Sequence, residues 1–336
     1  MPTVTDAPPP PEHAPPEPLT SPAPPVAKPS EGAEPERQRF SPLNLLTAGF
    51  LALWALFTAY PLLWTMMSAF KTNEDILSLP SCQMSWRFWE WAWCMVDPPE
   101  SLQFDNFARA WGEANIGQYF INSLIVVGGS LTLTMLLGSM AAYVLARYEF
   151  PGNRVIYYGF VGGLMFPVFL ALVPLFFVVS NMKTVPVIGE YLTLNSYGGL
   201  ILVYAAYSLP FTVFFMSAFF RTLPTTVAEA GLIDGCSHFG LFFRVMLPMA
   251  KPGLISVGIF NFIGQWNQYL LPVVLMTEPD KRVLAQGLAS LAVSMGYRGD
   301  WAALFAGLAL AILPVLLAYL LFQRQLQAGL TAGLMK

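Results

Sequence analysis

Charged side chains are scarce in this chain. Asp, Glu, Lys and Arg make up 11% of its 336 residues, whereas hydrophobic residues make up 55%. A soluble globular protein carries about 25% charged residues. Because so few charges cannot cover a surface that faces water, the composition predicts a membrane protein. The net charge of −3 argues against a nucleic-acid partner.

Motifs for catalysis and for metal or nucleotide binding are also missing. The three cysteines are too few for a disulfide scaffold and form no Cys-X-X-Cys pair. The sequence contains no G-x-x-x-x-G-K-[ST] phosphate loop and no cluster of His, Cys or carboxylate residues with metal-ligand spacing. The long apolar runs contain neither paired carboxylates nor a nucleophile beside a base, which argues against an intramembrane enzyme. We therefore predict no catalytic residue, no metal site and no cofactor in this chain.

The first 43 residues differ in composition from the rest. They contain 14 of the 29 prolines and almost no large apolar side chains. Such a segment buries too little apolar surface to offset the entropy of ordering, so we predict a disordered, partly polyproline-like tail at residues 1–43. Either the tail is dispensable or it docks to a specific partner.

Six apolar runs are long enough to cross about 30 Å of hydrocarbon as helices. All the charged residues lie outside these runs. We therefore predict an all-α polytopic membrane protein, with six transmembrane helices in a membrane domain at residues 44–336. The predicted spans are residues 45–70, 118–146, 155–180, 198–220, 252–277 and 301–323.

An even number of spans places both termini on the same side of the membrane. The short loops on that side contain Arg147 and Arg154, and then Arg221, Arg244 and Lys251. By the positive-inside rule this side faces the cytoplasm, so we predict a bacterial inner-membrane protein with both termini inside. The segments predicted inside are 1–43, 221–251 and 324–336, and those predicted outside include 71–117 and 278–300.

The first outer loop, 71–117, contains Cys82 and Cys94. The space outside a bacterial inner membrane is oxidising, which favours a disulfide between them. The alternative is a pair of buried free thiols, and the sequence does not decide between the two.

The fifth predicted span carries a polar stripe. Asn261, Gln265 and Gln268 follow i, i+4, i+7 spacing, which predicts that they share one helix face. An amide at membrane depth needs a partner. That partner is a neighbouring helix, a second membrane subunit, or a sugar hydroxyl or water in a translocation path. Prolines inside the spans are expected to kink helices: Pro167, Pro174, Pro210, Pro272 and Pro314.

The inner loop 221–251 carries the strongest local pattern. Thr226 and Glu229 have the spacing of a capping box, which predicts a helix at residues 227–234. Gly235 then suits a left-handed turn, and Ser237 suits the cap of a second short helix that Leu247-Pro248 ends. Two short helices joined by a sharp bend can present a knob to a partner. The simpler interpretation is that Glu229 only caps a helix and Gly235 only turns a corner.

This loop resembles the E-A-A-x-x-x-G motif, with its Leu-Pro ending, of the membrane subunits of ATP-binding-cassette (ABC) importers. The matching stretch is Glu229-Ala-Gly-Leu-Ile-Asp-Gly235, in which Gly231 replaces the second alanine. Four further stretches resemble the carbohydrate branch of that family, and within it the maltose-type, MalG-like permeases. They are Asn106-Phe-Ala-Arg-Ala-Trp111 with Phe120-Ile-Asn-Ser-Leu124, Ala141-Ala-Tyr-Val-Leu-Ala-Arg147, Trp266-Asn-Gln-Tyr-Leu-Leu-Pro272 and Gly329-Leu-Thr-Ala-Gly333.

The resemblance implies a transport subunit without ATPase activity of its own. Its expected partners are a second permease, two ATP-binding subunits that hold ATP and Mg²⁺, an external solute-binding protein and membrane lipid. It implies an ATPase-coupling site and a C-terminal tail that reaches toward the ATPase. The coupling residues would be Glu229, Ala230, Gly231, Asp234, Gly235, Leu247 and Pro248, and the tail residues Gly329, Leu330, Thr331 and Gly333.

The expected cargo is a di- or oligosaccharide. No ionisable residue lies within the six runs, which favours a neutral solute and an external source of energy over a proton- or ion-coupled carrier. A permease for another small solute and a carrier that works alone remain as alternatives.

Overall fold

The computed structural model describes residues 42–77, 99 and 101–332. Cys82, Cys94, Gly333 and nearly all of the proline-rich tail lie outside these residues. The described chain is built from helices and contains no strand, which confirms the all-α class. By its internal contacts the chain divides into residues 1–55 and residues 56–336. The first part contributes the beginning of helix α1 (Pro42–Ser68), and the following paragraphs concern the second part.

Four described helices are long and apolar enough to cross a membrane. They coincide with the first, second, fourth and sixth predicted spans. Each is a run of good helix formers and apolar residues, long enough for the hydrocarbon thickness. The four helices are α1, α5 (Ile116–Arg147), α9 (Tyr197–Thr222) and α16 (Trp301–Ala332).

The predicted third span is not one helix. Helix α6 (Asn153–Met165) ends before Pro167, and α7 (Val168–Asn181) leaves at an angle of 105°. Proline lacks an N–H and forces the residue before it out of the helical region. Phe166 accordingly has an extended backbone with ψ of 122°. The expected kink at Pro167 is thus a complete break, whereas Pro174 lies inside α7.

The predicted fifth span is also interrupted. Helix α13 (Lys251–Trp266) ends well short of residue 277, and a separate helix, α14 (Leu270–Leu275), follows and contains Pro272. At its other end α13 is bent by 78° from the helical segment 238–249. Among the described residues there are therefore four single helices long and apolar enough to cross a membrane, or up to six such spans if each bent pair is counted as one. Helices α9 and α16 continue past Pro210 and Pro314.

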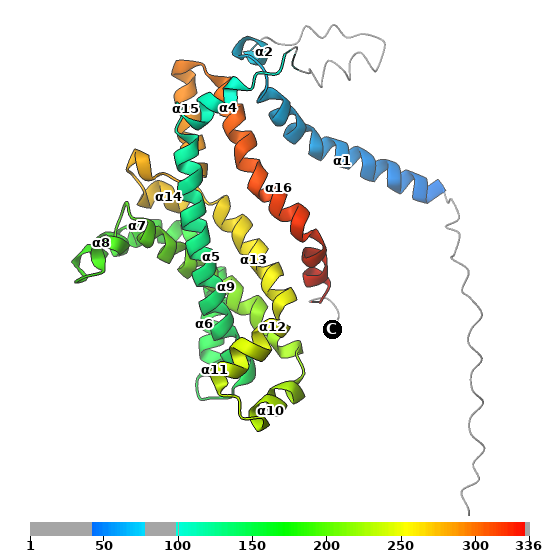
Figure 1. Cartoon of the computed structure of the whole chain (residues 1–336), viewed down its shortest axis with the longest axis vertical. Helices are drawn as coiled ribbons and strands as arrows, with labels where there is room; N and C mark the ends of the chain where they lie inside the picture. Colours follow the sequence, from blue (N-terminus) through cyan, green and yellow to red (C-terminus); the bar gives the residue numbers. More distant parts are fainter. Residues whose placement is uncertain (1–41, 78–98, 100, 333–336) are drawn as a thin grey trace, which may run out of the picture. The chain divides into compact units, whose positions relative to one another are not determined.

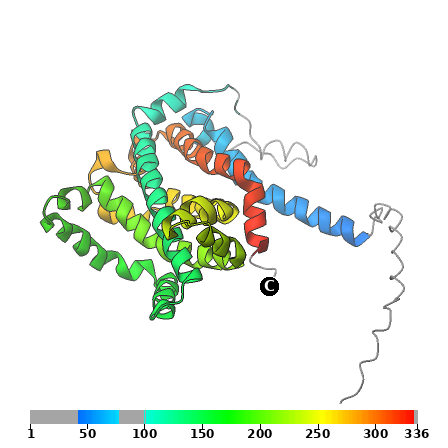
Figure 2. The ribbon, with the colours of Figure 1, turned by 60° about the horizontal axis from the view of Figure 1, so that its bottom comes forward.

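Helices α5 and α9 form the most extensive contact of the fold, and α13 runs beside both (Figures 1 and 2). Small residues allow the close approach, as is typical between membrane helices. A Cβ on Gly138 of α5 would lie 2.5 Å from Cγ2 of Thr212 on α9. Helix α16 packs against α13 on the other side.

Short helices lie in the connections between these long helices. The expected outer loops contain α2 (Asn73–Leu77), α4 (Asp105–Trp111), a 3-10 turn η1 (Met182–Thr184), α8 (Gly189–Leu192), a 3-10 turn η3 (Pro279–Lys281) and α15 (Leu284–Arg298). The expected inner loop contains α10 (Thr225–Ile233), α11 (His238–Leu241), a π-helical turn η2 (Phe242–Met246) and α12 (Leu247–Met249). Figure 1 shows α10 and α11 at the opposite end of α5 from α4 and α15.

Candidate coupling site

Helix α10 begins earlier than the sequence pattern predicts. Its first residue is Thr225, its N-cap position is Pro224, and no side chain caps it. The capping box of Thr226 and Glu229 is therefore wrong, because Thr226 already lies inside the helix. Pro224, with φ of −60°, sets the helix entry instead, since its missing N–H is not needed there. Glu229 is exposed on the second turn of α10.

The bend after α10 matches the prediction in detail. Gly235 has φ of +83°, the left-handed conformation that glycine adopts most easily. The N–H of Cys236 donates to the Gly231 carbonyl at 3.0 Å, and that of Gly235 donates to Leu232 at 3.1 Å. These two bonds form a Schellman motif, which satisfies carbonyls at the helix end. The chain thereby reverses within a few residues after Asp234.

The second short helix starts as predicted and continues further. The Ser237 hydroxyl accepts the N–H of Gly240 at 3.2 Å, so Ser237 caps α11. Helix α11 runs into the π-helical turn η2 and then into α12, which ends at Met249. The predicted stop at Leu247-Pro248 is therefore wrong by about one residue. Pro248 lies in the first turn of α12, where its missing N–H is tolerated.

The bend exposes apolar side chains at its tip. Ile233 is 85% exposed and Phe239 is 70% exposed, and Leu232 beside them is also exposed. Glu229 and Asp234 lie exposed on the same short helix and its end. Exposed apolar groups bordered by polar ones mark a contact surface for a partner. We call residues 229–239 the coupling tip.

The base of the coupling tip is fixed to the bundle. Phe242 and Met246 are buried, and the Phe242 ring lies 5.1 Å from that of Tyr143 on α5. Arg147, at the end of α5, donates to the carbonyl of Leu223, where α9 ends and the loop begins. The exposed tip is thus attached through its base to α5 and to the end of α9.

Further contacts tie the second half of the tip to α5. The Tyr148 hydroxyl lies 2.8 Å from Nδ1 of His238, within hydrogen-bond distance. Their rings also meet edge to face, with centroids 5.6 Å apart. His238, the first residue of α11, is therefore held by the residue that follows α5.

The fifth-span amides make contacts between helices. Gln265 accepts a hydrogen bond from the Ser130 hydroxyl on α5 at 2.7 Å and donates to that of Ser208 on α9 at 3.0 Å. Asn261 donates to the Thr212 hydroxyl on α9 at 2.8 Å. Both amides are buried, at 4% and 5% exposure respectively. Among the alternatives for Asn261 and Gln265, these hydrogen bonds favour interhelical bonding within this chain.

Gln268 does not belong to this stripe. Helix α13 ends at Trp266, so the i, i+7 relationship that predicts a shared face is broken. Its backbone N–H instead donates to the Gln265 carbonyl at 3.3 Å in the turn that follows.

The C-terminal residues continue the last span. Helix α16 extends through Gly329, Leu330 and Thr331 to Ala332, without a boundary at the predicted span end. The Ser256 hydroxyl of α13 donates to the Gln325 carbonyl at 2.8 Å, which joins the two helices there.

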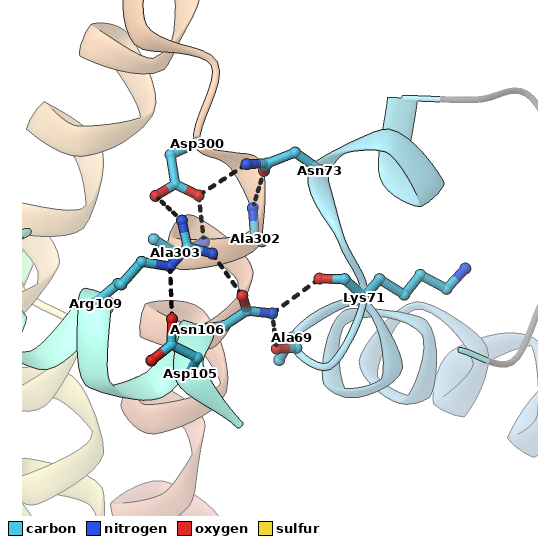
Figure 3. Close-up of polar contacts among 9 residues, drawn as sticks. All are labelled: Ala69, Lys71, Asn73, Asp105, Asn106, Arg109, Asp300, Ala302 and Ala303. Atoms are coloured by element: carbon cyan, nitrogen blue, oxygen red, sulfur yellow. Dashed lines mark hydrogen bonds and ion pairs between the residues drawn. The ribbon is translucent and has the colours of Figure 1, made fainter. Parts of the chain in front are cut away.

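Residues 106–111 contain a polar cluster whose contacts the sequence pattern alone does not show. Asn106 of α4 is 2% exposed and donates to the carbonyls of Ala69 and Lys71, at 2.9 and 2.8 Å. Arg109 donates to the Asn106 side chain and to Asp300 at 2.7 Å, beside the start of α16. Figure 3 shows these side chains joining the ends of three segments. In the sequence, the spacing of Asn106 and Arg109, which places both on one helix face, was the feature that could have indicated this cluster.

Comparisons with known proteins agree with this architecture. A solved structure described as a bacterial ABC transporter involved in the import of the acidic polysaccharide alginate superposes with a TM-score of 0.66, covering 84% of this chain and 95% of that chain. At 19% identity this likeness shows a shared fold.

The sequence shows the family itself. Residues 134–331 match the model of the binding-protein-dependent transport system inner membrane component. The diacetylchitobiose uptake system permease protein NgcG of Streptomyces coelicolor is 47% identical, over 90% of this chain and 92% of its own. The arabinooligosaccharides transport system permease protein AraQ of Halalkalibacterium halodurans is 31% identical, over 88% and 98% respectively. The chain belongs to this family of ABC transporter permeases, which are inner membrane components.

Proposed function

We propose that the chain is one of two permease subunits of a binding-protein-dependent sugar importer. ATP is hydrolysed by partner subunits that also hold Mg²⁺, and an external binding protein delivers the sugar. The observation that carries the proposal is the exposed coupling tip on its anchored base. Such a tip fits a groove in an ATP-binding subunit, and closure of the nucleotide-bound pair then rotates α5 and α9 together.

The coupling residues have distinct roles in this mechanism. Ile233 and Phe239 supply the apolar contact area, while Glu229 and Asp234 supply exposed charges beside it. Ala230 and Gly231 are small residues that allow a close approach to α10, and Gly235 sets the bend. Leu247 and Pro248 lie in the helical segment that connects the tip to α13. The last turns of α16, with Gly329, Leu330, Thr331 and then Gly333, reach toward the same ATPase.

The proposed cargo is a neutral di- or oligosaccharide. NgcG and a second Streptomyces coelicolor relative, DasC, are both named for diacetylchitobiose uptake, and AraQ for arabinooligosaccharides. The six apolar runs contain no Asp, Glu, Lys, Arg or His, as expected of a path that carries no charged solute. Because of the 47% identity to NgcG, diacetylchitobiose is the first sugar to test.

Purification of the tagged chain from its native membrane tests the assembly. We expect an ATP-binding protein, a second permease and a solute-binding protein to be recovered together and identified by mass spectrometry. Uptake of radiolabelled diacetylchitobiose should depend on this chain. Recovery of the chain alone, with uptake that needs no ATPase, would favour a carrier working by itself.

A photo-crosslinking residue tests the coupling contact directly. Placed at position 233, it should capture the ATP-binding subunit. At position 321, where Leu321 of α16 is 62% exposed, it should capture lipid or the second permease. Capture of the ATPase at 321 and not at 233 would show that the interface is assigned to the wrong face.

Reporter fusions test the proposed orientation. With both termini in the cytoplasm, green fluorescent protein fused after Lys336 should fluoresce, and alkaline phosphatase fused there should be inactive. The opposite result would place the coupling tip outside, where no ATPase can reach it.

A further inference from the structure

Side chains from elsewhere in the fold hold the segment that leads into α15. Asn122 of α5 donates its two amide hydrogens to the carbonyls of Asp280 and Arg282, at 2.9 and 2.8 Å. The Ser123 hydroxyl accepts the N–H of Leu284, the first residue of α15, at 2.8 Å. A helix leaves its first N–H groups without partners of its own. Helix α5 therefore supplies the N-terminal cap of α15.

A second asparagine holds the other end of this segment. Asn195, in the turn before α9, accepts the N–H groups of Thr277 and Glu278 at 2.6 and 3.0 Å. Its amide also donates to the Thr277 hydroxyl at 3.0 Å. The backbone of residues 277–284 is thus held from two separate parts of the chain.

Asn122 is fully paired and fully buried. Its Oδ1 accepts hydrogen bonds from the Tyr197 hydroxyl at 2.8 Å and from Gln118 at 2.9 Å. Together with its two donated bonds, these use the hydrogen-bonding capacity of the amide. The side chain is 0% exposed. A buried, satisfied amide of this kind fixes the relative positions of the groups around it.

The first half of this segment turns its side chains outward. Thr277, Glu278, Pro279 and Asp280 are exposed although the backbone beneath them is fixed. Farther along α15, Val293 is 78% exposed. A surface that is already ordered before a partner arrives loses little conformational entropy on binding. The segment lies at the end of α5 opposite the coupling tip (Figure 1).

We propose that Asn122 and Ser123 are positioning residues for docking of the external solute-binding protein. They hold the backbone of residues 277–284, and so keep the exposed residues 277–280 in the conformation that this soluble partner contacts. The inference rests on the proposed function, because it takes the importer's own binding protein as the occupant. It assigns a role to the Asn-Ser pair that the family resemblance leaves without one.

The test uses the assembled importer in lipid nanodiscs, with its own sugar-loaded binding protein added at increasing concentration. Asn122→Asp puts an acceptor where two carbonyls need donors, and Ser123→Ala removes one bond. We expect the concentration of binding protein that gives half-maximal ATPase stimulation to rise about tenfold for Asn122→Asp and about threefold for Ser123→Ala. These fold-changes correspond to about 1.4 and 0.7 kcal/mol of binding free energy. Basal ATPase activity and the maximal stimulated rate should stay as in the wild type.

Thr132→Ala is the matched control on the same helix. Thr132 is exposed on α5 and donates only to the carbonyl of Gly128, at 2.8 Å within its own helix. The Thr132→Ala variant should have the same half-maximal concentration as the wild type. Hydrogen exchange of the Leu284 amide should be faster in Ser123→Ala and unchanged in Thr132→Ala.

The outcomes separate docking from general stability. An unchanged half-maximal concentration in Ser123→Ala overturns the inference, as does an equal fall of basal and stimulated rates. If Asn122→Asp does not assemble, Tyr197→Phe takes its place, because it removes one bond to Asn122 and leaves both backbone contacts. A wild-type complex that no binding protein stimulates would instead refute the proposed function.

Discussion

Gly231 of α10 lies directly against Leu241 of α11. A Cβ on Gly231 would come within 2.8 Å of Cδ1 of Leu241, closer than van der Waals contact allows. Leu241 is 1% exposed and belongs to the cluster that holds the base of the coupling tip. Glycine in place of the second alanine of the motif therefore lets the two short helices pack closely.

This contact predicts that Gly231→Ala weakens the coupling tip. Alanine favours a helix over glycine by about 1 kcal/mol. Overpacking of a buried site costs about 1–3 kcal/mol, and the Leu241 side chain that would have to shift is buried. We expect less ATPase to co-purify and uptake to fall severalfold. Leu241→Val in the same chain should restore both, and a single variant as active as the wild type would show that Leu241 moves freely.

Gly235→Ala tests the bend itself. A non-glycine residue in the left-handed region costs about 1–2 kcal/mol, so the Schellman turn should open and uptake should fall. Gly264→Ala on α13 is the control, because no atom lies within 4 Å of its added Cβ and its φ is not positive. Uptake and recovery of the complex should be normal for Gly264→Ala. Equal behaviour of the two variants would contradict a requirement for the left-handed turn.

Gln265→Leu distinguishes interhelical bonding from contact with the sugar. Hydrogen bonds between membrane helices average about 0.6 kcal/mol each, so loss of the bonds to Ser130 and Ser208 should lower stability by about 1 kcal/mol. Thermal unfolding in detergent should show this loss, with an unchanged KM for uptake. Gln323→Leu, at an exposed amide bonded only within its own helix, should leave the melting temperature unchanged. A raised KM with normal stability would point to the translocation path.

The sequence predicted the features that depend on composition and on local backbone chemistry. Four spans coincide with apolar runs, Gly235 takes the left-handed conformation that a residue without a Cβ adopts easily, and the Ser237 hydroxyl caps α11. The failures arise where two local signals compete. Pro224 starts α10 in place of Thr226, and Pro167 ends a helix in a run whose hydropathy alone predicts continuity.

Other features depend on contacts between distant segments. The role of Asn122 becomes visible only when residues 280–282 are brought beside α5, and no periodicity in the sequence shows this. The end of α13 at Trp266 likewise moves Gln268 out of a stripe that spacing alone predicts. Tertiary pairing, rather than propensity, decides such positions.

The exposed apolar tip gives the most direct test of coupling. Ile233→Asp puts a charge at a position that is 85% exposed, so the chain should fold and insert normally. In the complex the same charge would be buried against the ATPase without a partner, which costs several kcal/mol. We therefore expect at least a tenfold loss of co-purified ATPase and of uptake. Thr226→Ala, on the same helix and without a capping bond, should match the wild type in both measurements. Normal uptake by Ile233→Asp would place the force-transmitting contact elsewhere on the loop, because a carboxylate buried without a partner at this position would weaken the interface.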